Sequence, residues 1–200
     1  FGLCDLAGFP KDIYYMYQSR FTTKPMAHIF PRNMDDFEDG TKPLICVYSN
    51  CYKVELYVNG KLDAAQTQDA MNDKYMLRWW PPFHPGTITV KGYDEEGNLV
   101  ATDEVKTSTG VAAKLALSSY KPTVNVNSDD LVFITCDILD ENGVFVPDAD
   151  TVVTFTCEGG TVLGTDNGNA ACVENMRGNV RSAFSGKCLC VCRHDGTPGD

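Results

Sequence analysis

The sequence predicts a mainly β protein made of two β-sandwiches in tandem, preceded by one short α-helix. Three observations support this fold class. Apolar and polar residues alternate over short stretches from about residue 42 onward, and turn residues separate these stretches. The only strong helical periodicity lies at residues 11–21. Short alternating strands, with turns roughly every eight to twelve residues, are typical of folds with two packed sheets.

The helix is predicted over residues 11–21. Pro10 lies near its start, Asp12 in its first turn and Arg20 near its end, a charge placement that complements the helix dipole. Its apolar residues recur at intervals of three and four and are Ile13, Tyr14, Tyr17 and Phe21. Such a stripe needs a partner surface.

The first sandwich is assigned to residues 29–110. Residues 53–58 alternate strictly, and Asn59-Gly60 then gives a hairpin signal, because both residues tolerate positive φ values. Residues 87–91 alternate again, and the turn at 94–98 leads into the next strand.

The second sandwich is assigned to residues 111–200, after a seam at Lys106–Gly110. Its turn at 140–143 resembles the turn at 94–97. The strands expected in it are residues 114–117, 131–139, 152–157, 180–184 and 188–192.

Composition restricts the class of partner. The chain has 200 residues, 43% of them hydrophobic, and a formal net charge of -10 at pH 7. An acidic surface repels phosphate backbones and anionic lipids, so we expect no nucleic-acid partner and no peripheral membrane role. No apolar run approaches the roughly 20 residues that cross a bilayer, so no membrane span is expected either.

The nine cysteines are an odd number, and a disulfide-stapled secreted fold is one interpretation of them. Buried free thiols are favoured, because a free cysteine in a strand behaves as a small hydrophobe. The cysteines in strand-like stretches are Cys136, Cys157, Cys188, Cys190 and Cys192. The last three are spaced too closely for a zinc knuckle, and we expect no metal and no cofactor.

Histidines and acidic residues give two weaker signals. His28, His84 and His194 have no metal-binding neighbour at helical or strand spacing, so surface roles are expected for them. A polar cluster offers oxygen ligands to calcium but lacks the spacing of a dedicated loop. Side chains that cap their own turns are the favoured explanation. The cluster consists of Asp137, Asp140, Asn142, Asp148 and Asp150.

An aromatic group at the middle of the chain is the candidate binding site. Trp79 and Trp80, with Phe83 and Tyr75, could stack on the C–H faces of sugar rings. Consecutive strand residues point to opposite faces, so one tryptophan is expected in the core and the other on the surface. Core packing with one exposed ring is the favoured interpretation.

Three stretches carry motifs of a known family. Residues 2–15, from Gly-Leu-Cys-Asp-Leu to Lys-Asp-Ile-Tyr-Tyr, look like the last strand and final helix of a catalytic TIM barrel. Residues 47–61 contain Tyr-Ser-Asn-Cys and Val-Glu-Leu-Tyr-Val-Asn-Gly-Lys, similar to a signature of the sandwich that follows this barrel. Residues 85–187 match the immunoglobulin-like domain beyond it. The chain therefore resembles the C-terminal region of family 2 glycoside hydrolases, β-galactosidases of the type common in Bacteroidetes.

The resemblance implies three parts. Residues 1–28 would be the last strand and helix of the TIM barrel, 29–110 the sandwich after it, and 111–200 an immunoglobulin-like sandwich of the invasin type. It also implies a retaining exo-β-glycosidase, in which one glutamate is the nucleophile and another the acid and base. Both glutamates lie on upstream barrel strands in this family, so no catalytic residue is expected in the chain.

Barrel active sites gather at the C-terminal ends of the strands, which places Asp5 and Leu6 near the pocket wall, although a structural role is preferred for them. The β-glucuronidase branch carries a Lys that contacts the sugar carboxylate. Here that position is Phe1, which favours a neutral sugar such as galactose.

The family's immunoglobulin-like domain continues beyond the segment that matches residues 196–200. An incomplete second sandwich with an open edge is therefore expected, and open edges pair with other chains. Together with the apolar stripe of the helix, this predicts self-association. The resemblance also suggests a periplasmic or cell-envelope location.

Three functions remain open. The leading one is a non-catalytic structural region of a β-galactosidase in carbohydrate breakdown, or of a β-glucuronidase or another family 2 exo-glycosidase. Its partners would be the upstream barrel of the same polypeptide and, through the enzyme, β-galactoside glycans. The second is a carbohydrate-binding module acting through Trp79 or Trp80. The third, an adhesin repeat, is disfavoured by residues 2–21.

Overall fold

The computed structural model describes residues 2–67, 76–121 and 123–197. The chain divides into two compact units, Phe1–Leu3 with Pro10–Ser108, and Cys4–Phe9 with Thr109–Asp200. The described residues form antiparallel sheets and one short helix. The predicted mainly β fold is therefore confirmed.

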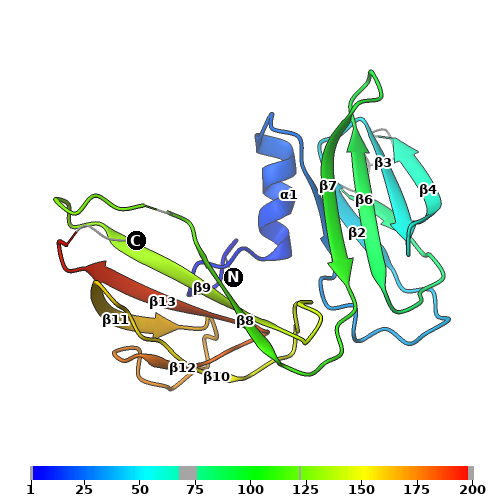
Figure 1. The fold of residues 1–200 in the computed structure, drawn as a ribbon. Helices are drawn as coiled ribbons and strands as arrows, with labels where there is room; N and C mark the ends of the chain where they lie inside the picture. Colours follow the sequence, from blue (N-terminus) through cyan, green and yellow to red (C-terminus); the bar gives the residue numbers. More distant parts are fainter. Residues whose placement is uncertain (1, 68–75, 122, 198–200) are drawn as a thin grey trace. The chain divides into compact units, whose positions relative to one another are not determined.

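The first unit contains two antiparallel sheets and the helix (Figure 1). One sheet has the strand order β1-β2-β5, and the other β4-β3-β6-β7. The strands are β1 Ala27–Phe30, β2 Ile45–Ser49, β3 Lys53–Val58, β4 Lys61–Thr67, β5 Leu77–Trp79, β6 Thr87–Tyr93 and β7 Leu99–Lys106.

Both sheets contribute to one core. On β3, Val54 and Leu56 are fully buried, whereas the alternate residues Lys53, Glu55 and Tyr57 are only partly buried. This is the period of two that the sequence shows. Each fully buried aliphatic side chain contributes about 1.5–3 kcal/mol to folding. The facing sheet supplies Ile29, Ile45, Val47, Leu77 and Trp79.

The predicted helix is present as α1, Asp12–Phe21. It lies against β1 and β2. All five residues of β2 are buried. Ile45 and Val47 belong to the core shared by the two sheets, so the other face of β2 needs a separate cover. The helix provides it, and Tyr15 stacks on His28 of β1 with 3.6 Å between ring centroids.

The predicted hairpin signal at Asn59-Gly60 is confirmed. Both residues adopt positive φ values, 48° and 79°, and they join β3 to β4. Asn tolerates this region because its short polar side chain bonds locally, and Gly because it has no Cβ.

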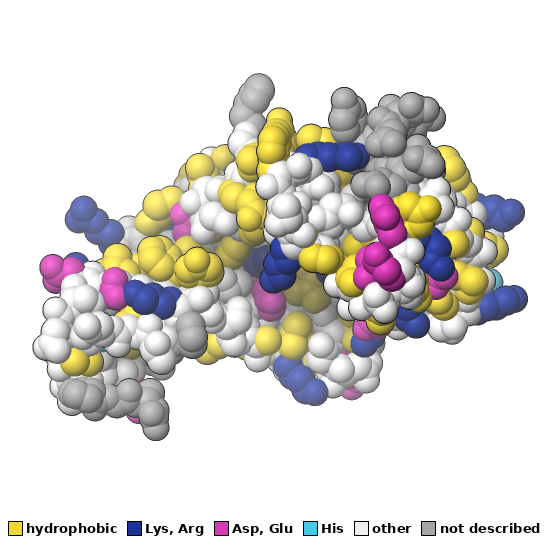
Figure 2. Space-filling view, turned by 90° about the horizontal axis from the view of Figure 1, so that it is seen from above, with side chains coloured by type: hydrophobic (Ala, Val, Ile, Leu, Met, Phe, Trp, Pro, Cys, Tyr) yellow, Lys and Arg dark blue, Asp and Glu magenta, His cyan; other side chains and the backbone are white. Residues whose placement is uncertain are grey.

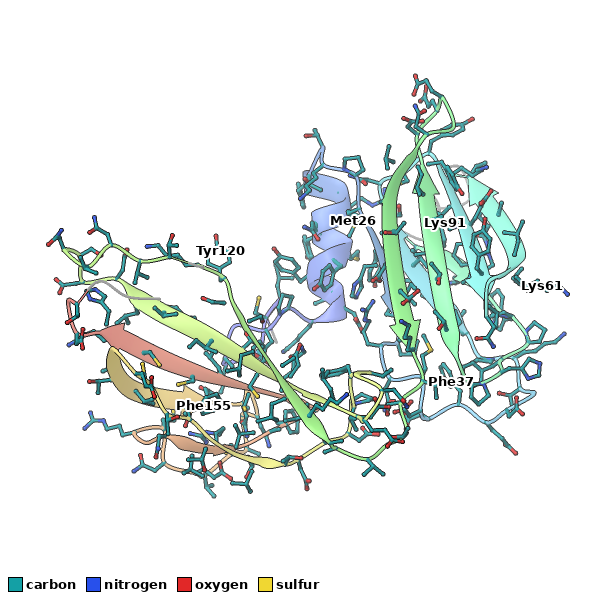
Figure 3. All side chains as sticks on the ribbon, in the orientation of Figure 1. Met26, Phe37, Lys61, Lys91, Tyr120 and Phe155 are labelled. Carbon is teal, nitrogen blue, oxygen red and sulfur yellow. The ribbon has the colours of Figure 1, made fainter. Side chains whose placement is uncertain are left out.

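The second unit also has two antiparallel sheets, with the orders β11-β13-β9-β8 and β10-β12. Its core includes Phe155, labelled in Figure 3, together with Cys136, Ile138, Cys188 and Cys190. The strands are β8 Lys114–Ser119, β9 Leu131–Leu139, β10 Val152–Thr154, β11 Gly160–Asp166, β12 Val180–Ser182 and β13 Lys187–His194.

Two predicted strands are shorter than expected. The strand placed at 152–157 ends at Thr154, so Cys157 lies outside it and is partly exposed. The strand placed at 180–184 ends at Ser182, because Phe184 forms an isolated bridge with Lys187 in the turn that leads into β13.

No strand of a sheet forms in described residues 2–10, where the last barrel strand was expected. Instead, the backbone folds on itself: the N–H of Asp5 donates to the carbonyl of Phe9, and the N–H of Gly8 to that of Asp5. The N–H of Lys11 also donates to the carbonyl of Leu3. A sheet strand requires a neighbouring strand for its hydrogen bonds, and the place of these residues in a barrel strand stays a prediction. The helix found in the described part of the chain, Asp12–Phe21, is too short to span a bilayer.

Candidate functional site

The two tryptophans have opposite environments. Trp79, the last residue of β5, has 3% of its surface exposed and packs in the core, whereas Trp80 is 57% exposed. The predicted split into one core ring and one surface ring is therefore confirmed. Phe83 is buried and meets Phe37 edge to face at 5.4 Å. Tyr75 lies outside the described residues. Of the three described members of this aromatic group, Trp80 is the one whose ring is exposed, and its binding to sugar stays a prediction.

Asp5 and Leu6 lie in the second unit. One Asp5 oxygen accepts a hydrogen bond of 2.9 Å from the N–H of Phe9. The other is so close to Gly168 that an added Cβ there would lie 2.2 Å away. Asp5 therefore fixes local backbone, while Leu6 is 65% exposed. Their place in a pocket wall stays a prediction, and Phe1, on which the neutral-sugar inference rests, lies outside the described residues.

The outer face of β3 and β6 carries a charged aromatic cluster. The Glu55 carboxylate accepts hydrogen bonds from the Tyr57 hydroxyl at 2.6 Å, the Tyr93 hydroxyl at 2.9 Å and the Lys53 ammonium at 2.9 Å. Chiefly the Tyr57 hydroxyl, and also Lys53, lower the pKa of Glu55 to about 2. The same bond raises the pKa of Tyr57.

Cations cover the rings of this cluster. The Lys53 ammonium lies 4.6 Å from the Tyr93 ring centroid, and that of Lys91 4.5 Å from the Tyr57 centroid. A sugar would have to displace these cation–π contacts before it could stack on either ring. The cluster is therefore better suited to stabilising the sheet than to binding a glycan.

His28 was expected at the surface, and this expectation is wrong. It is 7% exposed, and its Nε2 lies 3.0 Å from the Asp12 carboxylate of α1. Its Nδ1 lies 4.0 Å from Asp103 of β7, which also pairs with Arg32. The helix that covers β1 buries the imidazole, and the ring links helix and sheet. His84 is exposed, and His194 contacts the carbonyl of Ser128 at 2.9 Å.

The acidic cluster of the second unit contains a buried turn residue. Asp140 is 1% exposed and accepts hydrogen bonds from the backbone N–H groups of Asn142, Val144 and Thr109 at 2.8–2.9 Å. These bonds lower its pKa against the opposing effect of desolvation. Asp140 therefore caps its own turn, as predicted, and also binds the backbone of Thr109. Asp137 does not follow this interpretation, because its carboxylate pairs with the Lys187 ammonium.

All nine cysteines are free thiols, as favoured from the sequence. In the second unit, the Cys190 and Cys192 sulfurs lie 3.5 Å apart within the core. Burial raises the pKa of Cys188 to about 12 and that of Cys192 to about 11. These groups stay protonated at neutral pH and act as packing residues.

Comparison with known proteins identifies the family. Residues 115–200 match the family described as "Glycoside hydrolase family 2 C-terminal domain 5", and residues 40–101 match a domain of unknown function, DUF4982. The chain is 41% identical over its full length to a β-galactosidase of Bacteroides ovatus, BoGH2A, of which it spans 23%. It is 30% identical over 93% of its length to a putative β-glucuronidase of Formosa agariphila, of which it spans 18%.

A solved structure supports the same relation. The chain superimposes over its full length, with a TM-score of 0.89 and 32% identity, on 25% of a β-glycosidase from Bacteroides vulgatus. Both units are thus similar to a region of a much longer glycosidase. The chain belongs to glycoside hydrolase family 2, of which it carries the C-terminal domains.

Proposed function

We propose that the chain is the non-catalytic supporting region of a retaining β-galactosidase, with both catalytic glutamates in an upstream barrel of the same polypeptide. The higher identity to a β-galactosidase, 41% against 30% for the putative β-glucuronidase, supports galactosides as substrates. A β-glucuronidase is the alternative parent. The resemblance favours an extracytoplasmic location.

The observation that carries this proposal is the exposed side of α1. One side of the helix is fixed to the first sandwich through Tyr15 and His28. The other side presents Ile13, Tyr17 and Phe21, which are 38%, 44% and 83% exposed. Tyr17 and Phe21 stack on each other at 6.1 Å. A helix with apolar residues on two sides suits a position between two domains.

This proposal is tested in the polypeptide that joins the chain to its catalytic domain. Phe21→Asp places a charge on the exposed side of α1 and should lower both the Tm and the aryl β-galactoside activity. The control Tyr120→Asp changes a residue that is 97% exposed in the second unit and should leave both unchanged. Equal behaviour of the two variants would count against a domain contact through α1.

The second candidate function is glycan binding through Trp80, favoured by its 57% exposure. Affinity electrophoresis in gels containing plant or algal galactans tests it. Retardation that is lost in Trp80→Ala and kept in Tyr120→Ala would support binding, and unretarded wild-type chain would exclude it for those polymers.

A further inference from the structure

The first unit contains a groove of about 400 Å³ at the end of the β3–β4 hairpin. Its volume falls within the roughly 300–1,000 Å³ of small-molecule sites. The hairpin contributes Asn59, Lys61, Leu62 and Asp63, and the loop after β5 contributes Pro82 and His84. Figure 3 shows Lys61 at the end of this hairpin. We propose that this groove binds a neutral pyranose ring.

Asn59 holds the two walls of the groove together. Its side-chain oxygen accepts a hydrogen bond of 2.7 Å from the N–H of Thr87. Its amide nitrogen donates to the carbonyls of His84 and Pro85, both at 3.4 Å. A Cβ on Gly86 would lie 2.0 Å from the Asn59 oxygen, so glycine is required for this approach. The groove is therefore formed before any ligand arrives.

The loop that carries Pro82 and His84 is also held by contacts outside the groove. Phe83 is 1% exposed, and its N–H donates to the carbonyl of Thr41 at 2.8 Å. The next residue, His84, has its Nδ1 2.6 Å from the Asp39 carboxylate. This contact fixes the imidazole and leaves Nε2 with no partner among the described residues. A preorganised wall lowers the entropy that binding would otherwise cost.

The charges of the groove favour a neutral ligand. Lys61 and Asp63 are both exposed, and neither side chain has a hydrogen-bond or ion-pair partner within the described part of the chain. The opposite charges of Lys61 and Asp63 cancel, so the groove offers no net attraction to an anion or to a cation. Hydroxyl groups both donate and accept, so a polyol satisfies Lys61, Asp63 and the free nitrogen of His84 together.

Apolar surface completes the match to a pyranose. Leu62 is 48% exposed and Pro82 is exposed beside it in the groove lining. A sugar ring has C–H faces as well as hydroxyl edges, so it can cover these side chains while its edge bonds the polar ones. This site goes beyond the supporting role proposed above, because it requires no contact with a catalytic domain.

The test is a titration of the ¹⁵N-labelled 200-residue chain with methyl β-galactopyranoside, methyl β-glucopyranoside and glucuronate, followed by amide chemical shifts. Saturable shifts at Asn59, Lys61, Leu62, Asp63 and His84 are expected with the neutral glycosides, and weaker shifts with glucuronate. Because no catalysis is measured, failure here leaves the supporting function untouched, and failure of that function leaves this result unchanged.

Substitutions in the groove test whether the chemical-shift changes arise from binding there. Lys61→Ala and Asp63→Asn should each weaken binding at least about tenfold, the loss expected for one charge-assisted hydrogen bond. Lys24→Ala, at an exposed lysine of the same unit, should bind like the wild type. Absence of saturable shifts, shifts confined to other surfaces, or tighter binding of glucuronate would overturn the proposal.

Discussion

The two units cover their sheets differently. In the first unit, all of β2 is buried, because the facing sheet covers one side and α1 the other. In the second unit, Leu115 and Leu117 of β8 lie directly opposite Ile138 and Cys136 of β9. Residues directly opposite share a sheet face. Ile138 and Cys136 are fully buried, yet Leu115 and Leu117 are 53% and 63% exposed.

The cause is the small size of the covering sheet. Only β10 and β12 face the four-stranded sheet within the described residues, and they cover its centre. A groove of about 260 Å³ lined by Leu117, Val132 and Ile134 remains beside them. Figure 2 shows hydrophobic side chains on the molecular surface. Exposed core-type residues mark a surface suited to pairing, and the predicted self-association through an open edge stays a prediction.

The largest expected effect comes from comparing a buried leucine of the first unit with an exposed leucine of the second. Leu56→Ala, in the filled core of the first unit, should lower the free energy of unfolding by about 3 kcal/mol. Leu117→Ala, at an exposed position of β8, should change the free energy of unfolding by less than about 0.5 kcal/mol. Both tryptophans lie in the first unit, so their fluorescence in urea reports that unit, while far-UV circular dichroism reports both. Similar losses of unfolding free energy in the two variants would contradict the difference in burial between the two leucines.

A smaller effect concerns the charged cluster on the first unit. The pKa of Glu55 is lowered from 4.5 to about 2, so its stabilisation is present above pH 4.5 and is lost as pH falls toward 2. Glu55→Gln should lower the free energy of unfolding by about 1 kcal/mol at pH 7. Between pH 4.5 and pH 2, this free energy should fall less steeply in the variant than in the wild type. Glu95→Gln, in an exposed turn, is the control and should keep the wild-type pH profile in urea titrations.

Amide hydrogen exchange should show whether Asp140 keeps the buried turn of the second unit closed. Asp140→Ala removes the acceptor for the N–H groups of Asn142, Val144 and Thr109, so hydrogen exchange at these amides should accelerate about tenfold or more. Asp140→Asn keeps one acceptor oxygen and should give an intermediate rate. Unchanged exchange in both variants would contradict the capping role.

Thiol labelling requires no substitution and still distinguishes the two units. The partly exposed thiols are Cys4, Cys157 and Cys172, all in the second unit, and the other six are buried. A maleimide at neutral pH should first label these three and reach Cys46 and Cys51 of the first unit only on unfolding. Mass spectrometry of tryptic peptides checks the order, and early labelling of Cys46 or Cys51 would contradict it.

Local patterns predicted the local structure well. The stripe at 11–21, the alternation at 53–58 and the Asn59-Gly60 turn all correspond to observed elements, because each depends on neighbouring residues. The strand β11 escaped prediction because Gly160 and Gly164 interrupt its apolar pattern. Both glycines are required there, since an added Cβ would lie 2.5 Å from the Arg193 carbonyl and 2.6 Å from that of Met176.

Features that depend on distant contacts could not be predicted. His28 is buried only because α1 packs on β1, and the groove forms only because the loop at Pro82 and His84 returns to the hairpin at Lys61 and Asp63. None of these residues has a sequence neighbour that marks its role. The split between Trp79 and Trp80 was predictable because consecutive residues of an extended chain point to opposite sides.

The most direct test of the central claim is the hydrolysis of aryl β-galactosides and aryl β-glucuronides by the purified 200-residue chain. The supporting role predicts release no faster than that from a mock purification of the same host. Turnover that co-elutes with the folded chain and is absent from the mock preparation would contradict it.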